Sequence, residues 1–171
     1  MLSLLPVLFC AGLITSSSLS ASRAALLDSP YRHVRTTNGN VQRLLETGVR
    51  RSPTFASLLA RLNASDVIVY IEQTTQMPQT LEGRLLLMPL VNHQRYLRIQ
   101  IARGASPTEL VALIGHELRH AIEVAEATDV RDEDGLERLY RRIGASSAAE
   151  HTYDTEAARA TGRRVRQELV A

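Results

Sequence analysis

Apolar side chains recur every three to four residues along several stretches of the chain, which is the spacing of an amphipathic helix. The longest stretch also carries a clear start signal: Ser106 can cap a helix, Pro107 suits the first helical position, and Glu109 completes a capping box. The pattern predicts helices over residues 41–50, 53–62, 106–127, 135–143 and 152–170.

Short apolar runs replace the helical spacing in the middle of the chain. Residues 67–72 are β-branched and nearly all apolar, residues 84–91 form a second apolar run, and residues 96–102 alternate between apolar and polar side chains. The short links between these three strands favour antiparallel pairing. We therefore expect an α+β fold, with N-terminal helices, a small antiparallel three-stranded sheet, a long central helix and C-terminal helices.

Length and charge narrow the class of protein. The chain has 171 residues and a formal net charge of +2, so it can form one domain with a sizeable core and lacks the excess of charge typical of nucleic-acid binding. Cys10 is the only cysteine, and it lies in the apolar N-terminal segment. A processed chain would therefore have no disulfide and no thiolate ligand, which restricts metal ligands to His, Asp and Glu.

The N-terminal segment differs from the rest of the chain. Residues 2–14 are almost entirely apolar, a Ser-rich stretch follows, and residues 22–24 (SRA) fit the small-x-small pattern of a signal-peptidase site. The apolar run is short for a transmembrane helix. We expect residues 1–24 to be a signal peptide and residues 25–171 to form one secreted or periplasmic domain; a membrane-anchored form is the alternative.

The central helix contains HELRH, which fits the H-E-x-x-H pattern of zinc sites. His116 and His120 are four residues apart, so both imidazoles leave the same face of a helix and can bind one tetrahedral zinc ion. Glu117 is rotated by about 100° from His116, which lets its carboxylate approach a zinc-bound water and accept a proton without taking a coordination site. The pattern predicts a zinc-dependent hydrolase with Glu117 as the general base.

A catalytic zinc site needs a third protein ligand. Glu123 is the nearest carboxylate but starts a turn further along the helix, so we expect it to support the site from outside or to form a salt bridge. Asp154 and Glu156, near the start of the last predicted helix, are both possible ligands, although acidic residues are favoured there without any metal. The residues alone leave the choice between Asp154 and Glu156 open.

The segments HELRHAIE and YDTEAARATG resemble the gluzincin-type metallopeptidases, and more narrowly small secreted bacterial proteins that carry HELxHAxE. The resemblance covers residues 106–169 and is specific mainly at HELRH. It implies a zincin-like fold, a peptide or protein substrate, and a third zinc ligand on the helix after the H-E-x-x-H helix. That position falls on Asp154, where the family has Glu, which keeps Glu156 as an alternative.

The hydrolase hypothesis gives roles to further residues, and the zincin resemblance adds a path for the substrate. Tyr153 or His151 would stabilise the oxyanion formed during peptide hydrolysis, and residues 96–102 would be an edge strand that receives the substrate as an added strand. The alternatives are a secreted, non-enzymatic domain whose metal is structural or lost, and a core helix in which HELRH binds no metal. Glu117 favours catalysis, because a structural site needs the two histidines but not this carboxylate.

Overall fold

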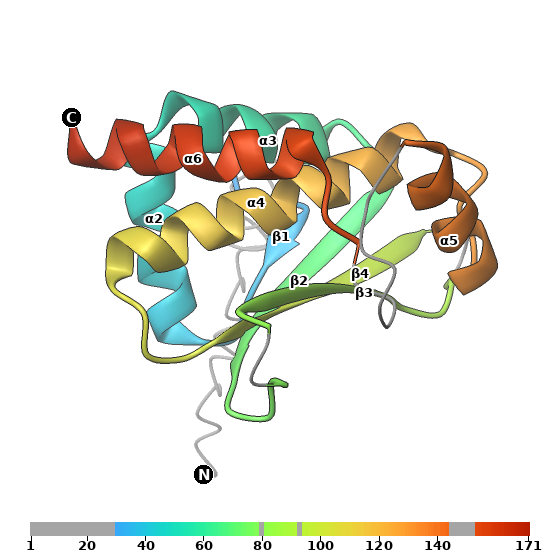
Figure 1. Cartoon of the computed structure of the whole chain (residues 1–171), viewed down its shortest axis with the longest axis horizontal. Helices are drawn as coiled ribbons and strands as arrows, with labels where there is room; N and C mark the ends of the chain where they lie inside the picture. Colours follow the sequence, from blue (N-terminus) through green and yellow to red (C-terminus); the bar gives the residue numbers. More distant parts are fainter. Residues whose placement is uncertain (1–29, 79–80, 92–93, 144–152) are drawn as a thin grey trace, which may run out of the picture.

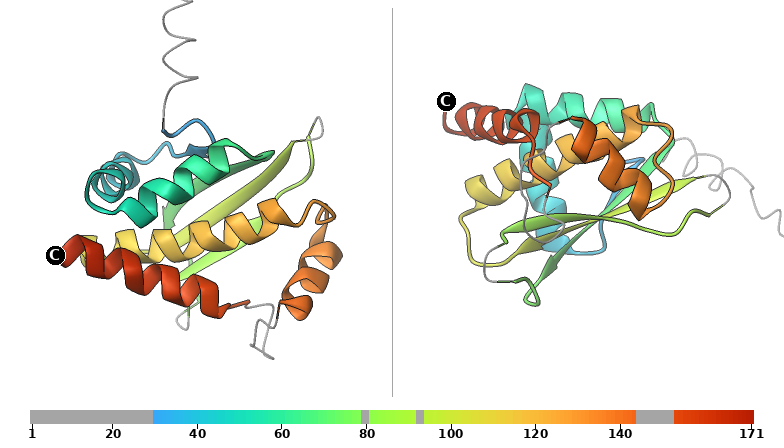
Figure 2. Two further views of the ribbon diagram at one scale, coloured as in Figure 1. Left: turned by 90° about the horizontal axis from the view of Figure 1, so that it is seen from above. Right: turned by 45° about the vertical axis from the view of Figure 1, so that its right-hand side comes forward.

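A layer of helices covers one face of a twisted sheet (Figures 1 and 2). The computed structural model describes residues 30–78, 81–91, 94–143 and 153–171. The signal peptide predicted at residues 1–24 and the alternative oxyanion residue His151 lie outside the described residues.

The helices begin and end close to where the local sequence predicts. Ser106 and Glu109 form the expected capping box, in which each side chain bonds to the backbone N–H of the other residue. The last helix was predicted from residue 152 but starts at Glu156, because Thr155 is its N-cap. Within the described residues the helices are α2 (Gly39–Arg51), α3 (Pro53–Asn63), α4 (Pro107–Glu126), α5 (Glu133–Arg142) and α6 (Glu156–Val170).

The sheet of the described residues has four strands, one more than predicted, and it is mixed rather than antiparallel. β3 and β4 are antiparallel, whereas β2 runs parallel to both β4 and β1. The predicted antiparallel pairing is wrong for β2, because β3, the next strand along the chain, lies beyond β4 at the far edge of the sheet and does not pair with β2. The strands lie in the order β1 (Val34–Arg35), β2 (Val67–Thr74), β4 (Arg95–Ala102), β3 (Gly83–Leu87).

The prediction that residues 96–102 form an edge strand is also wrong. β4 pairs with β2 on one side and with β3 on the other, so β3 is the edge strand beside α4. The predicted alternation along β4 is confirmed, since Leu97, Ile99 and Ile101 are fully buried against the helical layer. The hydrophobic core therefore lies between one face of the sheet and the helices.

α4 lies between the sheet and α6 (Figures 1 and 2). Glycines allow the two helices to pack closely: a Cβ on Gly115 would lie 3.0 Å from Val165, and a Cβ on Gly162 would lie 3.3 Å from the Cβ of His116. These contacts show that α6 runs antiparallel to α4. The segment just before α6 therefore lies beside the half of α4 that carries HELRH.

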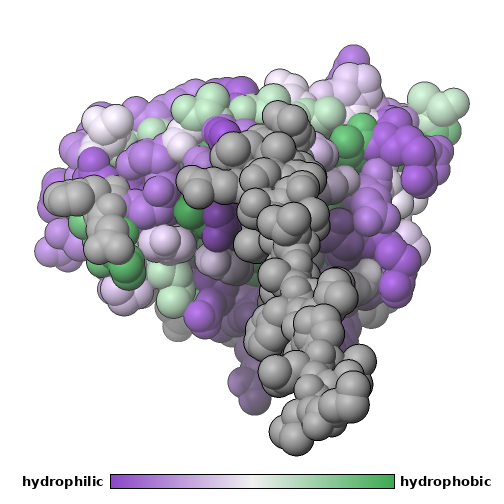
Figure 3. Space-filling model, turned by 180° about the vertical axis from the view of Figure 1, so that it is seen from behind, coloured by the Kyte–Doolittle hydropathy of each residue, from purple (hydrophilic) through white to green (hydrophobic). Residues whose placement is uncertain are grey.

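Hydrophilic side chains predominate on the face shown in Figure 3, and hydrophobic ones form small, separate groups. Small apolar groups of this kind are normal on the surface of a folded domain. Across the described ranges, no helix combines the length and the apolar character needed to cross a bilayer.

Candidate metal centre

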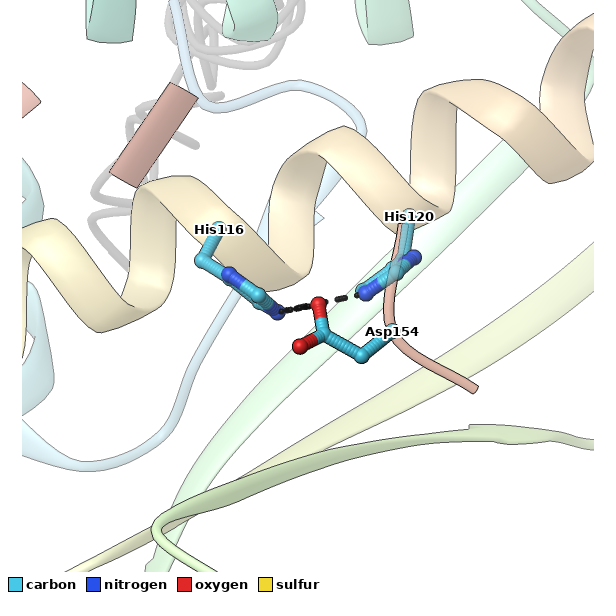
Figure 4. Close-up of side chains that lie close together, drawn as sticks. All are labelled: His116, His120 and Asp154. Atoms are coloured by element: carbon cyan, nitrogen blue, oxygen red, sulfur yellow. Dashed lines mark hydrogen bonds and ion pairs between the residues drawn. The ribbon is translucent and has the colours of Figure 1, made fainter. Parts of the chain in front are cut away.

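His116 and His120 project from the same side of α4, as their spacing predicts (Figure 4). Their Nε2 atoms are 3.2 Å apart. Two imidazole nitrogens bound to one tetrahedral zinc ion, each about 2.0–2.1 Å from it, would lie about 3.3 Å apart. Burial and the neighbouring His120 lower the pKa of His116, so its imidazole is neutral near pH 7 and free to act as a ligand.

Asp154 reaches the histidine pair from a separate segment of the chain (Figure 4). One ligand atom from each of His116, His120 and Asp154 lies within 4.8 Å of the other two. Asp154 Oδ1 is 3.6 Å from His116 Nε2 and is buried without a hydrogen-bond partner among the described residues, whereas Oδ2 accepts a hydrogen bond from Arg159 at 3.0 Å. A buried oxygen with no donor is costly, and a cation between it and the imidazoles would satisfy it. The three side chains fit a divalent metal such as zinc, without singling zinc out.

Glu156, the other predicted ligand, faces a different set of partners. Its carboxylate accepts hydrogen bonds from Arg159 Nε at 3.0 Å and from Arg163 at 2.6 Å. These contacts lower its pKa, and the side chain is exposed. The structure therefore brings Asp154, and not Glu156, to the two histidines.

Glu123 fixes the orientation of His120. Its Oε2 lies 2.9 Å from His120 Nδ1, and its Oε1 accepts a hydrogen bond from Thr155 at 2.7 Å. Burial alone would raise the pKa of Glu123, but the bonds from His120 and Thr155 outweigh burial and lower it. Because an ionised carboxylate only accepts, the proton of His120 lies on Nδ1, and the lone pair of Nε2 faces His116. This contact matches the supporting role expected of Glu123.

Two stacked tyrosines border the metal centre on the side of α5. The ring of Tyr140 lies edge-on to His120 with centroids 5.6 Å apart, and its hydroxyl is 3.3 Å from His120 Nδ1. Tyr153 stacks on Tyr140 with ring centroids 4.4 Å apart. Burial and then Glu137 on α5 raise the pKa of Tyr153. The structure thus places Tyr153 against Tyr140, and its role as an oxyanion stabiliser stays a prediction.

Glu117 is buried beneath the start of β3. Gly83 leaves the room for it, because a Cβ at that position would lie 2.6 Å from Glu117 Oε1. Burial raises the pKa of Glu117 to about 7, an effect that His120 opposes and Asp154 increases. The carboxyl group is therefore close enough for the charges of His120 and Asp154 to change its pKa. A pKa near neutrality suits a general base.

Sequence reasoning missed three residues that shape this site: Gly83, Tyr140 and Thr155. Thr155 had a usable signal, since a threonine followed by Glu156 and two alanines is a typical helix start and places Asp154 outside the helix. Tyr140 occupies an apolar position of an amphipathic helix and had no further mark. Gly83 had no local signal, because the reason for a glycine there is a carboxylate far away in the sequence.

Comparisons with protein-family models, with curated proteins and with solved structures find no match to this chain. The geometry of the site therefore carries the assignment of function. That geometry is a cluster of two histidines and one aspartate, with a buried glutamate between the same helix and the edge of the sheet.

Proposed function

We propose that this chain is a metal-dependent hydrolase that uses zinc and cleaves peptide bonds. One observation carries the proposal: His116, His120 and Asp154 converge from two distant segments, and a buried carboxylate oxygen of Asp154 faces His116 without a hydrogen-bond partner in the described part of the chain. The resemblance of HELRHAIE to gluzincin-type peptidases supports the same assignment.

Each residue has a position that suits its task. His116, His120 and Asp154 would hold the ion, and Glu123 keeps the lone pair of His120 directed toward it. A zinc ion in such a site lowers the pKa of a bound water toward neutrality and polarises a carbonyl group. Glu117 would accept the proton released during attack on the peptide carbonyl and pass it to the leaving amine.

The edge strand β3 offers a path for an extended peptide. Within the described residues β3 pairs with β4 alone, so its other edge presents unpaired N–H and C=O groups. A peptide added there would pass Gly83 and thus lie close to Glu117. β3 takes the place that the sequence assigned to residues 96–102.

Metal analysis and a peptide-library assay test the proposal together. Wild-type protein should hold about one zinc ion per chain after dialysis, and His116→Ala/His120→Ala should hold none. Glu117→Gln should keep the fold and most of the zinc but lower hydrolysis by about 100- to 10,000-fold. Glu126→Gln is the matched control, because Glu126 is an exposed glutamate on the same helix, paired with Arg61, and should leave cleavage unchanged.

Two results would overturn the assignment. If the wild-type protein holds no more zinc than the double histidine variant, His116 and His120 do not form a zinc site. If Glu117→Gln cleaves as fast as wild type, the cleavage does not come from this site even with zinc bound, and a non-enzymatic domain with a structural metal replaces the proposed hydrolase.

A further inference from the structure

A cavity of about 690 Å³ opens beside the metal centre and shares His116 with it. It is lined by the first half of α4, by α6 and by the segment that follows β4. Its volume lies within the range of about 300–1,000 Å³ that small-molecule sites occupy. A group held in this cavity would lie next to any substrate bond positioned at His116.

The cavity is lined with arginines: Arg103, Arg159, Arg163 and Arg166. The last three lie on α6 at positions i, i+4 and i+7, which places them along one side of the helix. Arg103 comes from a different part of the chain, the segment just after β4. The arginines thus approach the cavity from two elements.

Nearby acidic groups satisfy only part of these arginines. Arg159 donates to Asp154 and to Glu156, and Arg163 donates to Glu156 through a single nitrogen. A guanidinium has five N–H donors, so several donors on α6 stay available to a ligand.

Acidic groups hold Arg166 and Arg103 less closely than the other two arginines. Arg166 lies 3.4 Å from Glu109, whose other oxygen is held by Ser106 in the capping box. Arg103 is exposed and makes no side-chain hydrogen bond or ion pair with the described part of the chain. Glu82 is the remaining carboxylate in the lining. Its negative charge opposes the binding of an anion in the cavity.

We propose that this cavity binds a carboxylate of the peptide substrate, supplied by an acidic side chain or by the C-terminus. The inference rests on the proposed hydrolase function and deepens it by naming a substrate class. The planar fork of a guanidinium matches a carboxylate with two parallel hydrogen bonds. Leu110 and Leu113 form an apolar part of the lining, which can contact the methylene groups that carry such a carboxylate.

Calorimetry with blocked peptides distinguishes the two sources of the carboxylate. The probes are an N-acetylated, C-amidated pentapeptide of alanine with a central aspartate, the same peptide with asparagine, and acetyl-pentaalanine with a free C-terminus. Glu117→Gln protein binds them without turnover, both zinc-loaded and after EDTA treatment. One carboxylate peptide should bind at least about 10-fold more tightly than the asparagine peptide, because charged hydrogen bonds have that effect. The preference should persist without zinc, since the arginines provide it.

Variants locate the preference in the cavity. Arg103→Gln/Arg166→Gln should lose about 10-fold in affinity for the preferred carboxylate peptide and keep its zinc content. Glu82→Gln should bind that peptide more tightly. Arg164→Gln is the matched control, because Arg164 lies on the same helix but pairs with Glu168 outside this cavity and should bind as the parent protein does.

The outcomes separate this inference from the proposed function. Equal affinity for all three peptides overturns the carboxylate site, whatever the zinc and cleavage assays show. A preference seen only in the zinc-loaded protein also overturns it, because the metal would then be the carboxylate receptor. A further outcome is that the protein binds a carboxylate peptide more tightly than the asparagine peptide, and only with its arginines intact, while it neither holds zinc nor cleaves peptides. That result supports the carboxylate site and refutes the hydrolase function.

Discussion

The two carboxylate oxygens of Asp154 have different surroundings. Oδ2 accepts a hydrogen bond from Arg159, while Oδ1 is buried, lies 3.6 Å from His116 Nε2 and has no hydrogen-bond partner among the described residues. Glu156 has both oxygens engaged by arginines on its own helix. Only one of the two acidic residues is therefore placed to complete a metal centre.

We expect Asp154→Ala to lose zinc and Glu156→Ala to retain it. Removing one of three ligands leaves an incomplete site, whereas Glu156 contributes to surface ion pairs of little energetic weight. Zinc content measured against a competing chelator checks both variants. Full zinc retention in Asp154→Ala, with loss in Glu156→Ala, would reverse the assignment of the third ligand.

At the level of elements, a buried arginine joins the start of β4 to the end of α4. The side chain of Arg95 is 1% exposed and forms a two-pronged ion pair with Asp66 at 2.6 and 2.9 Å. The last carbonyls of a helix have no partner within the helix, and a cation suits the negative end of the helix dipole. Arg95 satisfies the carbonyl oxygens of Val124, Ala125, Ala127 and Val130.

Arg95→Met should destabilise the fold by about 3 kcal/mol, because breaking a buried charged network leaves its partners unsatisfied. In urea denaturation the midpoint should fall by roughly 1–2 M with an unchanged slope. Arg131→Met is the control: Arg131 also pairs with Asp66, at 3.4 Å, but is exposed, and its loss should cost less than about 1 kcal/mol. Equal midpoints for the two variants would contradict a special role for Arg95.

Glu168 ties α6 to the start of α3. Its carboxylate accepts hydrogen bonds from the Ser52 hydroxyl and from the backbone N–H and hydroxyl of Thr54. Burial alone would raise the pKa of Glu168, but these hydrogen bonds and that from Arg164 outweigh it and lower the pKa from 4.5 to about 2.

The stability that Glu168 contributes should depend on pH. A carboxyl group with a lowered pKa in the folded state stabilises the fold fully above its unfolded pKa and loses that effect as pH falls through the folded pKa. The free energy of unfolding of the wild type should exceed that of Glu168→Gln by about 1–3 kcal/mol at pH 7. This difference should disappear as the pH falls from 4.5 to about 2. Urea denaturation across this pH range measures the difference, and a difference that stays constant would refute the role of ionised Glu168.

At the scale of the whole molecule, the candidate metal centre comes together only because α6 packs antiparallel on α4. His116 and His120 lie on α4 and Asp154 lies on the segment before α6. Thr155 links the two elements through Glu123 while capping α6. An ion held at this point would connect the C-terminal helix to the centre of the fold, so metal binding and folding should be coupled.

Zinc should therefore raise the melting temperature. An ion that binds the folded state adds about 2.7 kcal/mol at 100 times its dissociation constant, which corresponds to roughly 5–10 °C for a chain of this size. Differential scanning calorimetry with zinc and with EDTA measures the shift, and His116→Ala/His120→Ala should show none. An equal shift in the double histidine variant would place the zinc elsewhere.

The sequence by itself determined the features that depend on near neighbours. The helix that carries HELRH, its capping box, the single face shared by His116 and His120 and the alternation along β4 all follow from spacing within a few residues. Such features are readable because backbone geometry fixes where residues i, i+2 and i+4 point.

The tertiary structure alone decided what depends on distant partners. It brought Asp154, and not Glu156, to the two histidines, and it put β4 inside the sheet and β3 at its edge. It also placed Gly83 against Glu117 and buried Arg95 at the end of α4. No local pattern encodes these choices, because each depends on which surfaces meet when the helices pack on the sheet. The physical reason is that packing energy comes from contacts between elements that lie far apart in the chain. Side-chain spacing and capping depend only on residues within one element.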